Sequence, residues 1–240
     1  MRKLLVCEKL LKTHGSSFTL GPVDFTINSQ EVAGFIGANG AGKSTLFQML
    51  SANTDASEGR VYYNKQRVTP DNAELRKQFG YLPQHPVLPK WVSATDLLKY
   101  AASVYNLSNA AELIKSQLKY WDIEFFESRP LAACSHGMQK RVGLALATIH
   151  SPDFLILDEP FSGLDIFHIQ ALKRKISDRV QEGKITILST HITPYTAKMC
   201  DRAFIVKSGN IQEIESWPQM HTDDRVSHIE NEFFGKPHEL

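Results

Sequence analysis

Nine residues near the start of the chain, GANGAGKST at 37–45, have types and spacing suited to holding phosphate groups. The stretch matches the pattern G-x-x-x-x-G-K-[ST], in which glycines let successive backbone N–H groups face the phosphates. Lys43 would bring a full positive charge to the β- and γ-phosphates, and the hydroxyl of Ser44 would reach a Mg²⁺ ion. An apolar run, VAGFI, precedes the loop and a helical pattern, STLFQML, follows it, so the helix N-terminus would add its partial positive charge. The residues expected to contact a nucleoside triphosphate are Gly37, Ala38, Asn39, Gly40, Ala41, Gly42, Lys43, Ser44 and Thr45.

Two acidic residues and a histidine follow apolar runs and supply the groups that hydrolysis of such a nucleotide needs. Asp158 ends the run FLILD, where it can reach the Mg²⁺ ion, and Glu159 comes next, where it can polarise the attacking water. His191 follows the run ITILST, and we expect it to donate to the γ-phosphate, because ligands bind outside the carboxyl ends of strands in open α/β sheets. Taken alone, the acidic pair would indicate a helix cap and the histidine a structural role. The phosphate-binding loop upstream favours the catalytic interpretation.

The elements that would position these groups are short strands alternating with helices. Continuous apolar runs such as FLIL and ITIL indicate strands buried on both faces, as in a parallel sheet covered by helices. Residues 93–127 show helical patterns without strand signals, which indicates a helical insertion. The expected fold is therefore α/β, with a P-loop NTPase core built on a mainly parallel buried sheet. Strands are expected at 4–10, 25–27, 32–37, 61–63, 79–82, 154–158, 185–190 and 203–207.

The composition of the 240-residue chain argues against several classes of protein. The formal charge is only +1, from 27 basic and 26 acidic residues, so no field attracts nucleic acid and no nucleic-acid partner is expected. No stretch approaches the roughly 18 uncharged apolar residues of a spanning helix, and the apolar part of MRKLLVCEK is too short for a signal peptide. Three widely separated cysteines, Cys7, Cys134 and Cys200, argue against a disulfide framework and favour a reducing compartment. We therefore expect a cytosolic protein.

Five motifs in one order resemble the ATP-binding cassette (ABC) family over essentially residues 3–215. GANGAGKST resembles the Walker A motif of that family, and FLILDEP resembles its Walker B motif with the catalytic glutamate. The remaining three resemble the glutamine loop, the D-loop and the H-loop: YLPQ at 81–84, SGLD at 162–165 and STH at 189–191.

The resemblance assigns further roles and boundaries. It implies that Gln84 takes part in Mg²⁺ coordination and in catalysis, and that Asp165 contacts the nucleotide. It also implies an ATPase domain over 1–216, with an N-terminal antiparallel β subdomain and a helical subdomain inserted at about 86–150. Residues 217–240 are polar and rich in histidine, and we expect them to form a short terminal helix or a frayed tail.

The segment CSHGMQKR at 134–141 stands where the family has its signature, usually LSGGQ. Ser135 and Gly137 keep the hydroxyl and the bare N–H at a helix N-terminus that would face a γ-phosphate held by a second chain. The form S-x-G-M resembles exporter-type (ABC-2-like) cassettes. We expect a working signature in which Ser135 and Gly137 contact nucleotide; a degraded signature, or an ordinary cap and first helical turn, is the alternative. Three letters depart from the usual form, at Cys134, His136 and Met138.

Two further positions depart from the family pattern. Lys140 stands where many members have glutamine, and the sequence offers no explanation for that change. Members usually stack the adenine base on an aromatic ring upstream of the phosphate-binding loop. Here LKTHGSSF places His14 in that register, with Phe18 nearby. We expect the imidazole to stack on the base; the alternative is that His14 is a loop residue and the base is held loosely.

By the same resemblance, the helical insertion would carry the surface that grips a membrane partner. HPVLPKWVSATDLL at 85–98 places Val87, Leu88, Trp91 and Val92 close to the glutamine loop. If these side chains are exposed, they could receive a short helix of the partner. The alternative is that they form the core of the subdomain itself.

Together these features resemble the ATP-hydrolysing subunit of an ABC transporter, which binds ATP and Mg²⁺. The resemblance implies a head-to-tail homodimer, or a heterodimer with a second ATPase subunit, that drives a separately encoded transmembrane permease subunit. The chain would then be cytoplasmic and peripheral, on the inner face of the cell membrane through its permease, and the signature favours export. A soluble ABC-type ATPase acting on ribosomes or DNA is disfavoured, because the chain has one cassette, no sustained heptads and no basic stripe. A non-hydrolytic nucleotide-sensing module is disfavoured by Glu159 and His191.

Replacing His14 with alanine should weaken ATP and GTP binding alike by about 1 kcal/mol, or about five-fold in Kd, because the base loses its stacking partner. His14→Phe should restore or improve binding. Titration with fluorescent nucleotide analogues measures both effects. If His14→Ala leaves the affinities unchanged while Phe18→Ala lowers them, the base stacks at Phe18 instead.

Overall fold

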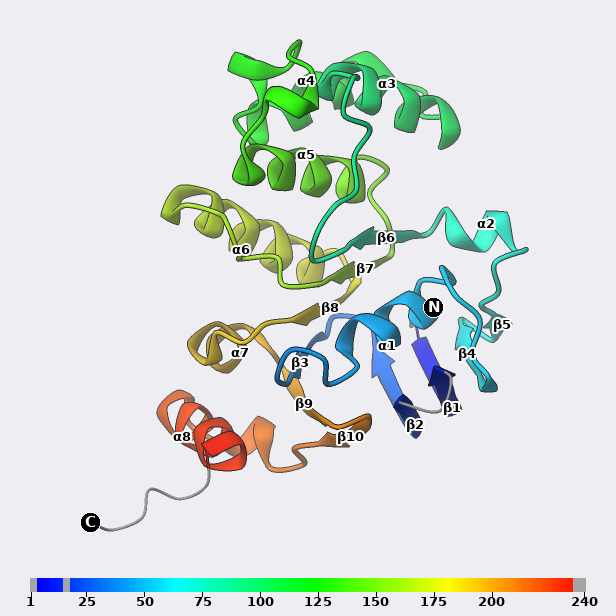
Figure 1. The fold of residues 1–240 in the computed structure, drawn as a ribbon, viewed down its shortest axis with the longest axis vertical. Helices are drawn as coiled ribbons and strands as arrows, with labels where there is room; N and C mark the ends of the chain where they lie inside the picture. Colours follow the sequence, from blue (N-terminus) through cyan, green and yellow to red (C-terminus); the bar gives the residue numbers. More distant parts are fainter. Residues whose placement is uncertain (1–3, 15–17, 235–240) are drawn as a thin grey trace.

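A computed structural model describes residues 4–14 and 18–234 and confirms an α/β fold (Figure 1). The strands are β1 (Leu4–His14), β2 (Phe18–Asn28), β3 (Val32–Ile36), β4 (Glu58–Tyr63), β5 (Gln66–Arg67), β6 (Phe79–Leu82), β7 (Phe154–Leu157), β8 (Ile185–Ser189), β9 (Arg202–Lys207) and β10 (Asn210–Glu213). The helices are α1 (Lys43–Leu50), α2 (Ala73–Arg76), α3 (Ala94–Val104), α4 (Ala110–Tyr120), α5 (His136–Thr148), α6 (Ile166–Gln181), α7 (Thr193–Met199) and α8 (Thr222–Phe234). Short 3₁₀ turns lie at Glu124–Phe126, Leu131–Ala133 and Trp217–Gln219.

The strands form two sheets. The larger has the order β10-β9-β3-β8-β7-β6, in which the neighbours from β9 to β6 pair in parallel and β10 pairs antiparallel with β9. The smaller has the order β2-β1-β4-β5 and is antiparallel throughout. The mainly parallel sheet and the N-terminal antiparallel sheet are thus both confirmed.

The strands that lead to the predicted catalytic residues are buried on both faces. Along β7, Phe154 and Ile156 face a core shared with α1 and the antiparallel sheet, whereas Leu155 and Leu157 face a core shared with α3, α5 and α6. Since successive side chains of a strand point to opposite faces, a run of four apolar residues is what a strand between two cores requires. The carboxyl end of β7 is therefore fixed by packing on both faces of the sheet.

Two strands were missed, and β1, β2 and β4 are each at least three residues longer than expected. β5 and β10 are short, and their side chains are exposed or half-buried, so neither gives an apolar run. The turn at Ser208 and Gly209 has positive φ at both positions, as a tight hairpin needs, and it folds β10 back onto β9. The strand expected at 25–27 extends over all of β2, because it pairs with β1 from Asn28 to Phe18.

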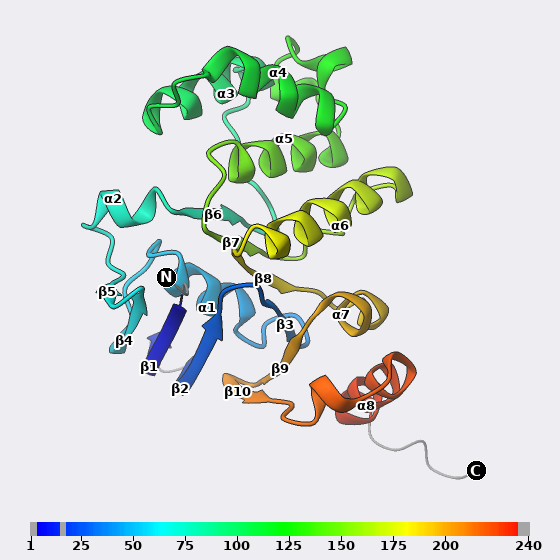
Figure 2. The ribbon, with the colours of Figure 1, turned by 180° about the vertical axis from the view of Figure 1, so that it is seen from behind.

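The helical insertion lies at one end of the molecule and α8 at the other (Figures 1 and 2). α3, α4 and α5 pack around the core that also contains Leu155 and Leu157 of β7, called the second core below. The completely buried side chain of Trp121 belongs to it. These helices fall within residues 86–150, and their status as a separate subdomain stays a prediction. No helix within residues 4–14 and 18–234 has the length and apolar character needed to cross a membrane.

Between residues 217 and 234 the chain forms a 3₁₀ turn and the helix α8, which packs on the rest of the molecule. Trp217 is completely buried in a small core that includes Ile229 of α8 and Ala197 of α7. Arg225 of α8 donates to the backbone oxygen of Ala197 over 2.9 Å and stacks on the Trp217 ring. α8 is thus fixed to α7, the helix that follows the loop containing His191.

Candidate active site

The loop between β3 and α1 lies over a cavity of about 210 Å³. α1 begins directly after Gly42, which adopts a left-handed conformation with φ 113°. A Cβ at Gly42 would approach Leu20 Cδ1 to 2.6 Å, so only glycine lets the loop lie this close to β2. The cavity thereby gains the N-terminus of a helix, a favourable place for an anion. Its lining is Phe18, Asn39, Gly40, Gly42, Lys43, Ser44, Thr45, Gln84 and Asp158.

Lys43 lies in the wall of this cavity and folds back over its own loop. Its ammonium donates to the backbone oxygens of Gly37 at 2.7 Å and Ala38 at 3.1 Å. Burial lowers the pKa of Lys43, and the nearby Glu159 and Asp158 oppose that shift. A phosphate at this point would offer the ammonium charged acceptors in place of neutral carbonyls, which gives shorter and stronger hydrogen bonds. The lysine is therefore placed for a phosphate ligand.

The Asp158 carboxylate joins the phosphate-binding loop to two strand ends. The Ser44 hydroxyl donates to its Oδ2 at 2.5 Å, and the Ser189 hydroxyl at the end of β8 donates to its Oδ1 at 2.6 Å. Ser44, Asp158 and Gln84 all line the same cavity and offer the oxygen atoms that Mg²⁺ prefers. Among the described residues, no group of three or more His, Cys, Asp or Glu side chains could hold a metal ion. The oxygen atoms of Ser44, Asp158 and Gln84 suit a Mg²⁺ ion.

Glu159 is almost completely buried and is held in an uncommon backbone conformation. Its φ is 46°, in the left-handed region that a residue with a Cβ rarely adopts. Its N–H donates to the Ser189 hydroxyl at 2.9 Å, and its Oε2 lies 2.9 Å from His191 Nδ1. Within the described part of the chain, the buried Oε1 atom has no hydrogen-bond partner. A buried carboxylate oxygen seeks a donor, so this atom fits the water that hydrolysis requires.

Lys140 lies beneath the site, although the sequence left its role unexplained. It belongs to α5 and is 1% exposed. Its ammonium donates to the backbone oxygen of Gln84 at 3.0 Å and lies 3.5 Å from that of Asp158. Burial lowers its pKa to about 8, and Asp158 and Glu159 oppose the shift. Lys140 thus connects the helix that begins at the signature to the glutamine loop and to the end of β7.

The segment 134–141 forms a helix cap and the first turns of α5, with Ser135 and His136 exposed and Lys140 and Arg141 buried. Ser135 is the N-cap of α5 and accepts from the N–H of Met138 at 3.3 Å. A Cβ at Gly137 would lie 2.6 Å from the backbone oxygen of Gly163, so the glycine is needed for close contact with the D-loop of the same chain. Cys134 is buried in the second core, where a small apolar side chain suffices. These contacts leave Ser135 exposed at the start of the helix.

Asp165 also caps a helix. Its carboxylate accepts from the N–H groups of Phe167 and His168 and lies 2.8 Å from His168 Nδ1. These contacts, led by the backbone hydrogen bond from His168, lower the pKa of Asp165. The other ring nitrogen of His168 lies 3.0 Å from the guanidinium of Arg141 in α5, so the D-loop and the signature helix are tied together.

The structure brings most of the predicted site residues to one place. Gln84, Asp158 and most of the phosphate-binding loop line one cavity, and Glu159 and His191 are linked to it through Ser189. Of the loop residues, Gly37 and Ala38 line a second cavity instead, and Ala41 is in the described lining of neither. Ser135, Gly137 and Asp165 are absent from the described lining of that cavity and belong to a second cluster, at the starts of α5 and α6. The side chain of His14 lies outside the described part of the structure. The roles of all these residues stay predictions.

Sequence reasoning missed Ser189 and did not assign Phe18 and Lys140. Ser189 ends a buried apolar strand, and a hydroxyl at a strand end beside an acidic pair is the signal that would have identified it. Phe18 pairs with His14 across β1 and β2 and lines the cavity itself. A lysine among apolar helical residues signals burial, but its partners come from segments 18 and 56 residues away in the sequence.

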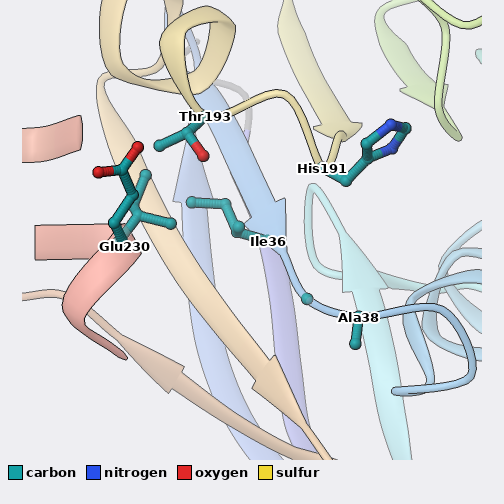
Figure 3. A pocket seen from close by; sticks show the side chains of 7 residues that line it. Ile36, Ala38, His191, Thr193 and Glu230 are labelled. Carbon is teal, nitrogen blue, oxygen red and sulfur yellow. The ribbon is translucent and has the colours of Figure 1, made fainter. Parts of the chain in front are cut away.

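A second cavity, of about 260 Å³, lies on the other side of the phosphate-binding loop. Figure 3 shows Glu230 of α8 and His191 on either side of Ile36, which lies at the end of β3. Its lining is Ile36, Gly37, Ala38, His191, Thr193, Ile229 and Glu230. With one glutamate and no lysine or arginine in its lining, this cavity is not suited to a triphosphate.

Comparison with known proteins places this geometry among ATP-binding subunits. Residues 20–162 match the family model for the ABC transporter. An uncharacterized ABC transporter ATP-binding protein of Methanocaldococcus jannaschii is 32% identical over 213 residues, which cover 87% of this chain and 76% of that protein. The lipopolysaccharide export system ATP-binding protein LptB of Haemophilus influenzae is 28% identical over 94% of this chain and 96% of its own. A solved structure of an ATP-binding subunit of an ABC transporter is 28% identical, with a TM-score of 0.83 over 94% of this chain and 99% of that one.

Lys43→Ala should weaken ATP binding by at least about ten-fold without unfolding the chain, because a charge-assisted hydrogen bond contributes roughly 1.5–3 kcal/mol. Fluorescence titration with an ATP analogue measures the affinity, and circular dichroism checks the fold. Lys115→Ala, on the exposed face of α4, is the matched control and should bind as the parent does. Unchanged affinity in Lys43→Ala would remove the assignment of the phosphate-binding loop.

Proposed function

The chain belongs to the ABC transporter family, as an ATP-binding subunit, and from this membership we propose that it hydrolyses ATP with Mg²⁺ and drives a separate membrane subunit. A head-to-tail dimer, formed with a second copy or with a second ATPase subunit, would close on the nucleotide. The observation that carries the proposal is the arrangement around Asp158, whose carboxylate accepts from Ser44 of the phosphate-binding loop and from Ser189 beside Glu159. Phosphoryl transfer to water depends mainly on such positioning and on charge stabilisation.

The position of each group in the site supports a particular role in ATP binding or hydrolysis. Lys43 would leave the carbonyl oxygens of its loop and bind the β- and γ-phosphates, while the N-terminus of α1 holds their remaining charge. Mg²⁺, when bound, neutralises phosphate charge and would be held by Ser44, Asp158 and Gln84. Glu159 would accept a hydrogen bond from the attacking water and take its proton as the new oxygen–phosphorus bond forms, while the bond between the γ-phosphorus and the β,γ-bridging oxygen breaks and ADP leaves.

In the structure, the His191 ring contacts the Glu159 carboxylate. A neutral ring that donates its Nδ1 proton to Glu159 can only accept at Nε2. Donation from His191 to the γ-phosphate therefore requires either that this contact break or that the ring carry both protons. The side chain is 63% exposed, so it is free to turn. We propose that the contact between His191 and Glu159 opens when ATP binds.

The second cluster supports a role in a dimer. Ser135 and His136 at the start of α5 are exposed, and neither belongs to the described lining of this chain's own nucleotide cavity. A helix N-terminus at the surface, with an N-cap hydroxyl, suits a phosphate that a second chain carries. Gly163 lies beside Gly137 at this helix start, and Asp165 is linked to α5 through His168 and Arg141. In this arrangement each nucleotide would lie between the loop of one chain and the signature of the other.

The surface beside the glutamine loop supports a membrane partner. Val87 and Trp91 are 96% and 82% exposed, and Tyr100 of α3 is also exposed, whereas Leu88 and Val92 pack against the second core. Patches of exposed large apolar side chains are typical of interaction sites, and Val87 and Trp91 are only four residues apart in the chain. We propose that they receive a short helix of the membrane subunit, which would hold the chain at the inner face of the membrane. Export is supported by the S-x-G-M signature and by the likeness to LptB, whose name describes an export system.

Glu159→Gln should keep ATP binding and lower turnover by about 100-fold or more, because the amide cannot take the proton from water but keeps the size of the side chain. Phosphate release measures turnover, and titration with an ATP analogue measures binding. Glu182→Gln, on an exposed carboxylate after α6, is the control and should turn over normally. A rate equal to the parent's in Glu159→Gln would show that Glu159 is only structural.

Ser135→Arg should bind ATP at its own Lys43 but fail to form ATP-dependent homodimers, because the added side chain blocks the signature. Mixed with a Lys43→Ala chain, it should form one composite site from the intact loop of the first chain and the intact signature of the second. Sedimentation with ATP measures this, with every chain also carrying Glu159→Gln so that the closed state accumulates.

The control for Ser135→Arg is Asn109→Arg, which places the same charge at the exposed start of α4. This variant should dimerise as its parent does. Dimers in the mixture that are absent from each variant alone would support the composite site. If Ser135→Arg dimerises as well as its parent, the segment 134–141 is only a helix cap.

A further inference from the structure

One peptide unit joins the metal-directed residue of the site to the water-directed one. It runs from the carbonyl of Asp158 to the N–H of Glu159, and its two polar groups point in opposite directions because the peptide is trans. The Ser189 hydroxyl accepts from the N–H at 2.9 Å, and the Lys140 ammonium lies 3.5 Å from the carbonyl oxygen. The unit is thus held between β8 on one side and α5 on the other.

This peptide unit needs external support. Glu159 follows it with φ 46°, and a non-glycine residue in the left-handed region persists only where its surroundings hold it there. Ser189 also donates to the Asp158 side chain, so it fixes the carboxylate and the N–H together. Lys140 supplies the corresponding support on the carbonyl side, where its Nζ is the side-chain donor.

The same ammonium reaches the glutamine loop. Lys140 Nζ donates to the backbone oxygen of Gln84 at 3.0 Å, so one atom spans the ends of β6 and β7. Gln84 and Asp158 both line the nucleotide cavity. Holding their carbonyl oxygens to a common donor limits how far the two side chains can separate.

We propose that Lys140 is a positioning residue that fixes Gln84 and the peptide unit between Asp158 and Glu159 relative to each other, and so sets the geometry of the Mg²⁺ and water positions. The role rests on the proposed hydrolysis of ATP at this site. Because α5 starts at the signature segment, the tie also connects the surface expected to meet the second chain with this chain's own catalytic groups.

Its surroundings explain why a lysine is tolerated here. An isolated buried ammonium is costly unless acceptors and opposite charge compensate it. Lys140 has two carbonyl oxygens as acceptors, and the buried carboxylates of Asp158 and Glu159 lie near enough to favour its charge. A long flexible side chain reaches both carbonyls from α5, whereas an apolar one would leave both without this donor.

A second buried cation offers a matched control. Arg179 of α6 is 3% exposed and donates to Pro152 O, Ile185 O and the Thr186 hydroxyl. These acceptors lie at the amino ends of β7 and β8, away from the site. Replacing either cation with methionine removes a buried donor, but only Lys140 contacts the catalytic segments.

The test compares the parent with Lys140→Met, Lys140→Gln and Arg179→Met in the full chain. Steady-state phosphate release gives kcat and KM. Titration with a fluorescent ATP analogue gives the nucleotide affinity without relying on turnover. One titration contains Mg²⁺, and a second contains a chelator in place of Mg²⁺. Thermal melting reports stability. We expect Lys140→Met to lower kcat at least ten-fold and to reduce the gain in affinity that Mg²⁺ provides, while its Mg²⁺-free affinity stays within about three-fold of the parent's.

Lys140→Gln keeps a donor but is one bond shorter, and we expect its kcat to fall between those of the parent and Lys140→Met. If Lys140→Met does not fold, Lys140→Gln decides: a lowered kcat with unchanged Mg²⁺-free affinity supports the proposal.

Arg179→Met should melt at a lower temperature but keep kcat within about three-fold when assayed below its transition. Full kcat and a full Mg²⁺ effect in the Lys140 variants, or an equal loss of kcat in Arg179→Met, would overturn the proposal.

The experiment distinguishes a failure of the positioning role of Lys140 from a failure of the proposed ATP hydrolysis. If the parent releases no phosphate, or releases it independently of Lys43, the proposed function fails. The Mg²⁺ dependence of nucleotide binding then still decides whether Lys140 positions Gln84 and Asp158. If the parent is active and depends on Lys43, a Lys140 variant with parental behaviour removes only the positioning role.

Discussion

The buried Asp158 carboxylate is the interaction on which the rest of the site depends. It is 1% exposed, and such a charge is tolerated only when hydrogen bonds satisfy it. Ser44 satisfies one oxygen and Ser189 the other. Because these donors come from the helix after β3 and from the end of β8, they hold three neighbouring strand ends of the sheet in register. The nucleotide cavity lies at the edge that these bonds define.

The charges buried at the carboxyl ends of these strands are balanced. Lys43 and Lys140 are buried together with Asp158 and Glu159, two positive groups with two negative ones. Lys43 bonds to its own loop, and Lys140 bonds to carbonyls beneath the sheet edge, so neither neutralises a carboxylate by direct contact. When a triphosphate binds, Lys43 in the loop could therefore exchange its carbonyl acceptors for phosphate oxygens. Lys140 could not move without disturbing the ends of β6 and β7.

The segment CSHGMQKR forms a helix cap, and this cap is compatible with the proposed signature role. Ser135 caps α5 as any serine at a helix start does, and Gly137 is required by the closeness of Gly163 in the same chain. Both features also leave the helix N-terminus exposed and bare, which is what a phosphate on a second chain would need. The substitution at Cys134 changes only a buried apolar contact. Of the three departures from LSGGQ, the one at Cys134 thus falls on a buried position that does not face a second chain.

The sequence by itself determined the features that depend on local spacing. The phosphate-binding loop, the acidic pair after β7, the buried strands and the α/β class follow from glycine spacing and apolar periodicity, which neighbouring residues impose on one another. Tertiary structure decided the contacts between distant segments: Ser189 with Asp158, Lys140 with Gln84, and the packing of α8 on α7. It also divided the stretch 85–98, leaving Val87 and Trp91 exposed while Leu88 and Val92 entered the core. Such contacts depend on which surfaces the folded sheet brings together, and no local pattern in the chain specifies that.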